Sequence, residues 1–438
     1  MLRNIQPGIF IGIPSITNEK TLKESIPPVE VMGEAGTVNH ESKKDIVDDI
    51  FTKTLSGYTI FKDRNVLRID YVPSRLQFRD IQTSKMAQIM APILKGQKPS
   101  NILLYGKTGT GKTVVTKYVL QKLLQKASES NVNVTISYVN ARTATTEYRV
   151  LVELASSMNI SLPFTGLSLS EAFDRILKHI SDKHSKSVFI IDEIDFLVHN
   201  YESNMLYEMT RSNERLPHDS FVTLIGISND IQFKDMLDPR TLSSLNEEEI
   251  MFTPYTVDEL RQILRERANL AFNPGVINDS AINLCAALAG SEHGDARRAV
   301  DLLRVAAELA ERQSSPTITD DHVRMATTSI EQDHIIDAVR SLPLHAKIVL
   351  LAISGQTEWN ATGALYNQYV KNCKKLGIEE LTQRRVSSII TELDTFGIIH
   401  APVISQGRMG RSKKIKLTAP VDTVLQALAE DETIRLLT

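Results

Sequence analysis

The hydrophobic pattern of the chain changes character near Ile250. Between Val66 and Ile250, short apolar runs with the composition of buried strands alternate with amphipathic segments of helical period. This alternation predicts an α/β fold in which a parallel sheet is covered by helices on both faces. The strand-like runs are Asn101–Tyr105, Val132–Val139, Val188–Ile191 and Phe221–Ile227.

After Ile250 the strand-like runs stop. Residues 257–330 have the period of three or four helices, among them Val257–Ala268 and Ala296–Arg312, and predict a small helical lid. From Gln332 onward, three helical segments and a glycine-containing hairpin predict a winged helix. Residues 1 to about 60 are rich in Pro, Gly, Ser, Thr and charge, which predicts a mostly disordered extension. The expected domains are the extension at 1–65, an α/β base at 66–250, the lid at 251–330 and a winged-helix domain at 331–438.

The composition is that of an ordinary globular protein. Of 438 residues, 42% are hydrophobic and 24% are charged, and the formal net charge is −3, so a nucleic-acid site would require local clustering of basic side chains. Cys285 and Cys373 are the two cysteines; they cannot build a disulfide framework and lack metal-ligand spacing. No apolar run approaches the roughly 20 residues that cross a bilayer. We therefore expect a cytoplasmic protein without a signal peptide or a membrane partner.

The segment after the first strand-like run carries a phosphate-binding pattern. Its glycines let backbone N–H groups turn towards phosphate oxygens, and the start of the following helix adds a positive dipole end. Lys112 can reach the β- and γ-phosphates, and the Thr113 hydroxyl can bind Mg²⁺. The pattern predicts a site for ATP or ADP with Mg²⁺. The residues that match G-x-x-x-x-G-K-[ST] are Gly106, Lys107, Thr108, Gly109, Thr110, Gly111, Lys112 and Thr113.

Polar residues follow two later strand-like runs and open one lid helix. Asp192 and Glu193 come directly after the third run; with a P-loop present, we expect Asp192 to hold Mg²⁺ and Glu193 to polarise the attacking water. Taken alone, such an acidic pair is more often solvated loop. Asn229 follows the fourth run and can orient the water or touch the γ-phosphate. Arg297 can reach the γ-phosphate from the lid; the alternative is a solvent-facing helix charge.

The segment Leu381–Gly397 predicts a helix with a polar outer face. Thr382 is a plausible N-cap and Gly397 a plausible residue just past the end. Apolar residues at 386, 389, 390 and 393 form the buried face. The opposite face suits a DNA major groove. The residues that we expect to contact DNA from this helix are Arg384, Arg385 and Ser388.

The hairpin that follows is basic. Residues 371–417 contain ten basic and four acidic side chains, a local charge of +6 in a chain of −3. Such clustering favours contacts to the phosphate backbone of DNA. A solvated basic loop on a winged helix that docks protein is the alternative. The predicted hairpin contacts are Arg408, Arg411, Lys413 and Lys414.

The motifs occur in the order found in the AAA+ ATPases, which the chain resembles. Their amino-acid sequences resemble those of the archaeal initiator family, which is related to the largest origin recognition complex subunit and the cell-division-control loader protein. The resemblance covers roughly residues 66–438. The segments that carry it are Tyr71-Val-Pro, Arg79-Asp-Ile-Gln82, Asn101 to Thr113, Asp192-Glu-Ile-Asp195, Ile227-Ser-Asn-Asp230, Leu237-Asp-Pro-Arg240 and Gly294-Asp-Ala-Arg-Arg298.

The resemblance implies an ATP-dependent DNA-binding replication initiator. Such a protein recognises double-stranded origin DNA, helps load the replicative helicase, self-associates on DNA, lies in the nucleoid, and hydrolyses ATP slowly as a switch. The resemblance also implies that Val72, Pro73 and Arg79 enclose the adenine and that Tyr255 and Arg267 contact the nucleotide. It further implies that a helical insertion with Tyr148 and Arg149 touches DNA.

One departure from the AAA+ pattern bears on the alternative functions. The position of the usual arginine finger reads Ser243-Ser244-Leu245, and only Arg240 lies nearby to substitute. An AAA+ motor or a clamp-loader-like ATPase is therefore less well supported, and the chain lacks cysteines for a clamp loader's zinc module. A winged-helix transcription regulator is the second alternative, although Glu193 argues against permanent inactivity.

Overall fold

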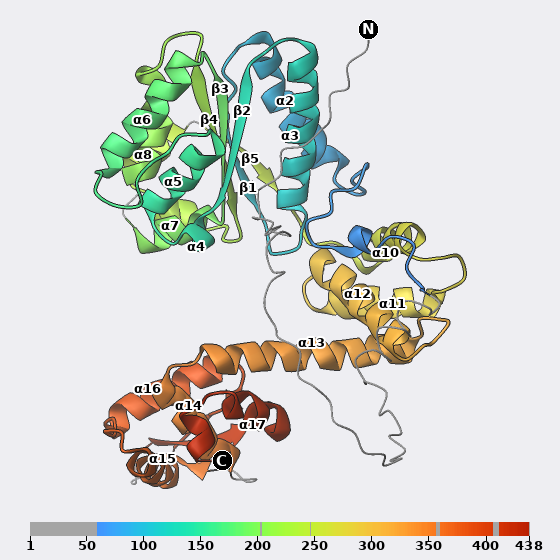
Figure 1. The fold of residues 1–438 in the computed structure, drawn as a ribbon, viewed down its shortest axis with the longest axis vertical. Coiled ribbons are helices and arrows are strands. Elements are labelled where there is room, and N and C mark those ends of the chain that lie inside the picture. The colour runs from blue at the N-terminus through green and yellow to red at the C-terminus, as the bar shows by residue number, and fades with distance from the viewer. Residues whose placement is uncertain (1–58, 202–203, 246, 356–359, 406–410, 438) are drawn as a thin grey trace, which may run out of the picture. The chain divides into compact units, whose positions relative to one another are not determined.

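A computed structural model describes residues 59–201, 204–245, 247–355, 360–405 and 411–437 (Figure 1). Residues 1–58 of the predicted extension therefore lie outside the described residues. Ile60 and Phe61 are buried and pack with Val66 and Leu67 into the hydrophobic core of the lid. The last part of the predicted extension thus contributes to a folded core. In the described part of the chain, no helix is both long enough and apolar enough to cross a membrane.

Five strands form one parallel sheet, which is the predicted arrangement. They are β1 (Asn101–Tyr105), β2 (Val134–Asn140), β3 (Lys186–Asp192), β4 (Phe221–Ser228) and β5 (Glu247–Met251). Their spatial order is β2-β3-β4-β1-β5. The helices of the base are α2 (Asp80–Met90), η2 (Ala91–Lys95), α3 (Lys112–Glu129), α4 (Ala141–Ala144), α5 (Glu147–Ser157), α6 (Leu169–Asp182), α7 (Ile194–Asn200), α8 (Asn204–Arg211), η3 (Ser212–Glu214), η4 (Phe233–Met236) and α9 (Pro239–Leu245).

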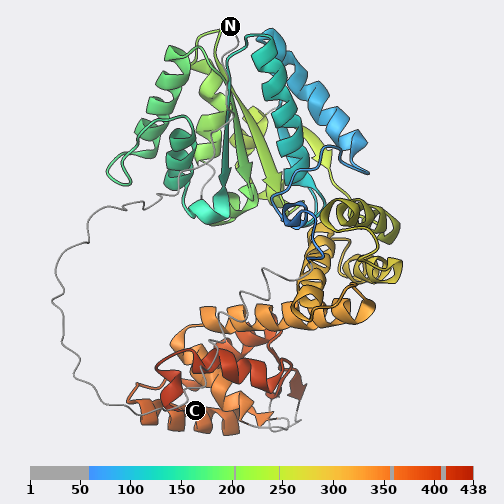
Figure 2. The ribbon, with the colours of Figure 1, turned by 45° about the vertical axis from the view of Figure 1, so that its right-hand side comes forward.

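Both faces of the sheet are covered, as Figure 1 and Figure 2 show. Ile102 and Leu104 of β1 pack into the core under α2 and α3, whereas Leu103 and Tyr105 pack into the core under α5, α6, α7 and α8. Successive side chains of a strand point to opposite faces, so a sheet buried on both faces requires continuous apolar strands. The predicted α/β fold class is confirmed.

Strand β5 is the element of the sheet that the sequence pattern did not predict. It is an edge strand that pairs with β1, Ile250 opposite Leu104, and it begins with three glutamates that hide the apolar pattern. Lys85 and Gln82 of α2 donate hydrogen bonds to the Glu249 and Met251 carbonyls. These bonds occupy part of an edge that would otherwise offer free backbone acceptors to another chain.

The lid is helical, as predicted. Thr256 and Glu259 form a capping box that starts its first helix. Alanines make up a large part of its core, and their small side chains let the helices approach closely. Its elements are η1 (Arg64–Leu67), α10 (Val257–Ala271), α11 (Asp279–Ser291), α12 (Ala296–Arg312) and the first half of α13 (Asp320–Ser341).

A winged helix follows, as predicted. Helix α13 runs through residue 330, where the sequence placed the boundary between lid and winged helix; Ile330 packs into the lid core and Val339 into the winged-helix core. The remaining elements are α14 (Leu344–Ser354), β6 (Asn360–Ala361), α15 (Thr362–Leu376), α16 (Gln383–Thr395), β7 (Ile399–His400), β8 (Val403–Ser405), β9 (Arg411–Leu417), α17 (Val421–Ala429) and η6 (Ile434–Leu436). Strand β9 pairs with β6, β7 and β8.

Candidate nucleotide site and candidate DNA surface

The P-loop connects β1 to α3 through a backbone that only glycine adopts readily. Gly109 and Gly111 have φ angles of 70° and 94°, in the left-handed region. A Cβ atom at Gly109 would lie 1.7 Å from Oδ1 of Asp295, the N-cap residue of α12. The Ala296 N–H also donates to the Gly109 carbonyl at 3.1 Å. The first turn of the lid helix α12 therefore packs directly on the P-loop.

The Lys112 ammonium lies inside the P-loop. It donates to the carbonyls of Gly106 and Lys107 at 2.6 and 2.8 Å and to Oδ1 of Asn229 at 2.9 Å. Burial lowers the pKa of Lys112 to about 8, and the negative charge of Asp192 opposes this shift. The structure thus brings together the predicted lysine of the loop and the predicted polar residue after β4.

Asp192 ends β3 beside the start of α3, and both of its carboxylate oxygens accept hydrogen bonds. The Thr113 hydroxyl and the Tyr138 hydroxyl donate to Oδ2 at 2.9 and 2.8 Å, and the Glu193 N–H donates to Oδ1 at 3.0 Å. Burial, and then the charge of Asp192, raise the pKa of Tyr138, which keeps its hydroxyl a donor.

This pair of oxygen ligands fits Mg²⁺. A hydroxyl and a carboxylate oxygen at hydrogen-bond distance are hard donors, and Mg²⁺ is usually held by one or two carboxylates together with phosphate oxygens and water. Among the described residues, no group of three or more His, Cys, Asp or Glu side chains could hold a metal ion by itself. Thr113 and Asp192 would leave coordination positions of the ion open for phosphate oxygens and water.

Glu193 is held in an unusual backbone conformation. Its φ of 54° and ψ of 45° are left-handed, a region that costs a residue with a side chain roughly 1–2 kcal/mol. The Asn140 amide donates to its carboxylate at 3.4 Å, and the Arg142 guanidinium lies 3.6 Å away. Sequence reasoning missed Tyr138, Asn140 and Arg142; polar residues at the carboxyl end of a predicted strand were the available signal, because ligands bind at that edge of an α/β sheet.

A cavity of ≈1150 Å³ lies between the base and the lid. Arg297, at the start of α12, is exposed and lines it. Of the predicted nucleotide-site residues, Gly106, Lys107 and Arg79 are outside the lining. Those that line the cavity are Val72, Pro73, Thr108, Gly109, Thr110, Gly111, Lys112, Thr113, Asp192, Glu193, Asn229, Tyr255, Arg267 and Arg297.

Arg79, expected to enclose the adenine, and Arg267, expected to contact the nucleotide, both make contacts within the protein. Arg79 is 3% exposed; its guanidinium donates to the Thr110 and Thr253 carbonyls at 2.8 and 2.7 Å and lies 3.6 Å from the centre of the Tyr255 ring. Arg79 thus joins the P-loop to the hinge before α10. Arg267 lies 4.4 Å from the centre of the Tyr71 ring and donates to the Val66 carbonyl in η1 at 2.7 Å.

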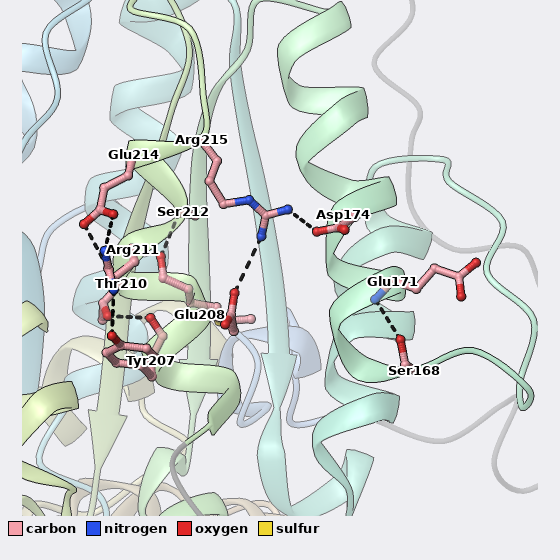
Figure 3. Close-up of polar contacts among 11 residues, drawn as sticks. Ser168, Glu171, Asp174, Tyr207, Glu208, Thr210, Arg211, Ser212, Glu214 and Arg215 are labelled. Carbon is pink, nitrogen blue, oxygen red and sulfur yellow. Dashed lines mark hydrogen bonds and ion pairs between the residues drawn. The ribbon is translucent and has the colours of Figure 1, made fainter.

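Arg240, the possible substitute for the arginine finger, is paired within its own chain. It binds Asp238 through two hydrogen bonds of 3.1 and 3.0 Å and lies 5.8 Å from the centre of the Tyr207 ring. Arg211 donates to the Tyr207 hydroxyl at 2.7 Å and pairs with Glu214 (Figure 3). A role for Arg240 at another subunit would require it to leave Asp238.

Helix α16 has the caps that the sequence predicts. The Thr382 hydroxyl accepts from the Arg385 N–H, and Gly397 has a φ of 72°. The four predicted apolar positions are buried, whereas Arg384 and Arg385 are exposed. Ser388 is half-buried on the outer face, where its hydroxyl donates to Glu392.

The hairpin lies against this helix. The Lys413 ammonium donates to the Thr391 hydroxyl at 2.6 Å, and Lys414 is exposed. Arg408 lies outside the described residues, as does the side chain of Arg411, whose backbone begins β9. In the insertion, Arg149 is exposed and the Tyr148 hydroxyl donates to the Pro163 carbonyl at 2.6 Å.

The chain matches known families over most of its length. Family models match for an AAA domain at residues 95–232, a Cdc6 AAA+ ATPase-type lid domain at 261–328 and a CDC6 C-terminal winged helix domain at 337–427. ORC1-type DNA replication protein 1 of Sulfurisphaera tokodaii is 45% identical over 391 residues, which are 88% of this chain and 97% of that protein. The protein of the same description from Aeropyrum pernix is 45% identical over 389 residues, which are 88% of this chain and 98% of that protein.

A solved structure is similar as well. The Aeropyrum pernix ORC1 protein, in complex with DNA, matches with a TM-score of 0.79 and 45% identity, covering 86% of this chain and 99% of that one. The Cdc6p structure from Pyrobaculum aerophilum, at 24% identity and a TM-score of 0.55, shares the fold. The resemblance in the sequence motifs is thus confirmed.

Proposed function

We propose that this chain, which belongs to the family of ORC1-type DNA replication proteins, is a nucleotide-controlled initiator that recognises double-stranded origin DNA and helps load the replicative helicase. The observation that carries the proposal is the contact of the lid with the P-loop. Because Ala296 donates to the Gly109 carbonyl and Asp295 packs on Gly109, a phosphate bound by the P-loop would touch base and lid together. The bound nucleotide would then control how the lid is held.

The proposed nucleotide site holds ATP or ADP with Mg²⁺. In this site Lys112 would exchange its backbone acceptors for phosphate oxygens, Thr113 and Asp192 would hold the ion, and Arg297 would approach the γ-phosphate from the lid. Tyr255 and Arg267 flank the base and the sugar, together with Val72 and Pro73. Bound Mg²⁺ would neutralise charge on the phosphates.

Hydrolysis is proposed to be slow and to act as a switch. Glu193 accepts the proton of the attacking water, and Asn229 orients that water. The Asn140 amide and the Arg142 guanidinium contact the Glu193 carboxylate. These contacts would have to be released before the carboxylate could meet the attacking water, which supports a slow step. The pairing of Arg240 with Asp238 also supports slow turnover.

The winged helix is the proposed DNA surface. The Aeropyrum pernix ORC1 protein was solved in complex with DNA, and the exposed Arg384, Arg385 and Lys414 are suited to contact a duplex. Tyr148 and Arg149 are proposed as a second contact. We also propose a nucleoid location and self-association on DNA.

ATP turnover and duplex binding by the full chain test the proposal, with Lys112→Ala as the matched variant. We expect slow turnover, and duplex affinity that differs between ATP and ADP in the parent but not in the variant. Rapid turnover that rises steeply with protein concentration would favour a motor or a clamp-loader-like ATPase. Occupancy of promoters rather than replication origins across a genome would favour a transcription regulator.

A further inference from the structure

Tyr138 reaches the nucleotide site from a strand that carries none of its predicted residues. It lies near the end of β2, opposite Ile190 of β3, and its two chain neighbours, Ser137 and Val139, are buried. The residue is 40% exposed, and the centre of its ring lies 5.5 Å from the Lys117 ammonium of α3. Its hydroxyl donates to Oδ2 of Asp192 at 2.8 Å. The side chain therefore extends from β2 to the end of the neighbouring strand.

We infer that Tyr138 is a positioning residue for the magnesium-binding carboxylate, acting through the hydrogen bond from its hydroxyl to Asp192. This inference rests on the nucleotide site proposed above. Tyr138 does not bind the ion or the phosphates; it fixes the rotation of the carboxylate that does.

The hydrogen bonds around Asp192 show why this one matters. The Glu193 N–H fixes Oδ1, and the two hydroxyl donors both reach Oδ2. One of them, Thr113, is itself the second proposed ligand, so its position depends on the ion. Tyr138 is the donor that fixes Oδ2 independently of the ion. Removing such a supporting hydrogen bond typically lowers metal affinity by about 10–100-fold.

A packing role is the competing explanation, and phenylalanine distinguishes the two. Tyr138→Phe keeps the ring and its contact with Lys117 and removes only the hydroxyl. Because the ring is partly exposed, the folded state should tolerate this change. Tyr118→Phe is the matched control: this tyrosine, on the neighbouring helix α3, packs against the core under α2 and α3.

The experiment measures binding of a fluorescent ADP by the full chain at increasing free Mg²⁺ and, separately, in EDTA. Mg²⁺ should increase the affinity for ADP. For Tyr138→Phe we expect the free Mg²⁺ concentration that gives half of this increase to rise about tenfold. Its ADP affinity in EDTA and its thermal unfolding should match those of the parent. Tyr118→Phe should match the parent in every measurement.

The decisive comparison is between Asp192→Ala and the double variant that also carries Tyr138→Phe. If Tyr138 acts through Asp192, adding Tyr138→Phe to Asp192→Ala should change the Mg²⁺ dependence no further, whereas independent effects would add. Additive effects, an unchanged Mg²⁺ dependence in Tyr138→Phe, or an equal loss of affinity in EDTA would each overturn the inference. If Mg²⁺ does not affect ADP binding by the parent protein, the proposed site is itself wrong, and the inference is overturned with it.

Discussion

Replacement of Arg79 by alanine is expected to destabilise the folded protein even when no nucleotide is bound. The guanidinium donates to two backbone carbonyls that belong to different segments, Thr110 in the P-loop and Thr253 in the hinge, and it stacks on Tyr255. Arg79 is 3% exposed and Thr110 is fully buried, so loss of the side chain would leave the Thr110 carbonyl buried without its donor. The Thr253 carbonyl, in an exposed residue, would lose its charged donor to water.

The contacts set the size of the effect. A hydrogen bond from a charged donor contributes about 1.5–3 kcal/mol to the free energy of unfolding, and a buried cation–π contact adds about 0.5–2 kcal/mol. Because the terms are not additive, we expect Arg79→Ala to lower the free energy of unfolding by about 3–5 kcal/mol. The free energy of unfolding of Arg79→Lys should lie between those of Arg79→Ala and the parent. One ammonium cannot reproduce the planar guanidinium, which spans the two acceptors.

Urea unfolding followed by circular dichroism, in EDTA and without nucleotide, measures this change. Arg75→Ala is the control; this arginine of the same segment is exposed, and its loss should alter stability by less than about 0.5 kcal/mol. The resemblance to the initiator family instead implies that Arg79 encloses the adenine. If Arg79→Ala unfolds like the parent and loses only nucleotide affinity, the structural account is refuted and the direct contact is favoured.

Four further changes test the site and the DNA surface. Gly109→Ala should abolish nucleotide binding measured by fluorescence titration, because its Cβ would overlap Asp295, and Asp295→Ala should restore part of the affinity; no restoration would point to backbone strain alone. Glu193→Gln should bind ATP like the parent but release no phosphate, since an amide cannot take up the proton; comparable turnover would mean that another base is used. Lys414→Ala should weaken binding to all duplexes and lower the slope of affinity against salt by about 0.9, whereas Arg384→Ala should cost about 1–3 kcal/mol on the preferred sequence and less on random DNA. Anisotropy titrations on the preferred and the random duplex measure these affinities. An equal pattern of loss in the two variants would contradict the assignment of Lys414 to phosphate and Arg384 to base contacts.

Local signals in the sequence were sufficient where one segment determines its own structure. Asn101–Tyr105 and Ala296–Arg312 were predicted with the bounds that β1 and α12 have. The caps of α16 were also predicted, because a capping hydroxyl and a left-handed glycine act on neighbours in the chain.

Features that depend on which distant segments meet were not predictable in this way. Strand β5 is defined by its pairing with β1 rather than by its own glutamate-rich composition. The bond from Tyr138 to Asp192 spans 54 positions, and only the pairing of β2 with β3 brings the two side chains together. Arg79 appeared in the sequence as a residue of a family motif, and nothing near it in the chain indicated that its partners would be Thr110 and Thr253.

In the proposed function, the hydrogen bonds of the P-loop would link nucleotide binding to movement of the lid. The Gly109 carbonyl accepts from the lid, and the Lys112 ammonium is shared between P-loop carbonyls and Asn229. A phosphate that enters the loop must draw the ammonium away from these acceptors, and each buried carbonyl that loses its donor costs about 1–3 kcal/mol unless another donor replaces it. The first turn of α12, which packs on Gly109, also carries Arg297. Under the proposed function, binding of the phosphate would be coupled to the position of that turn, and through α12 to the lid.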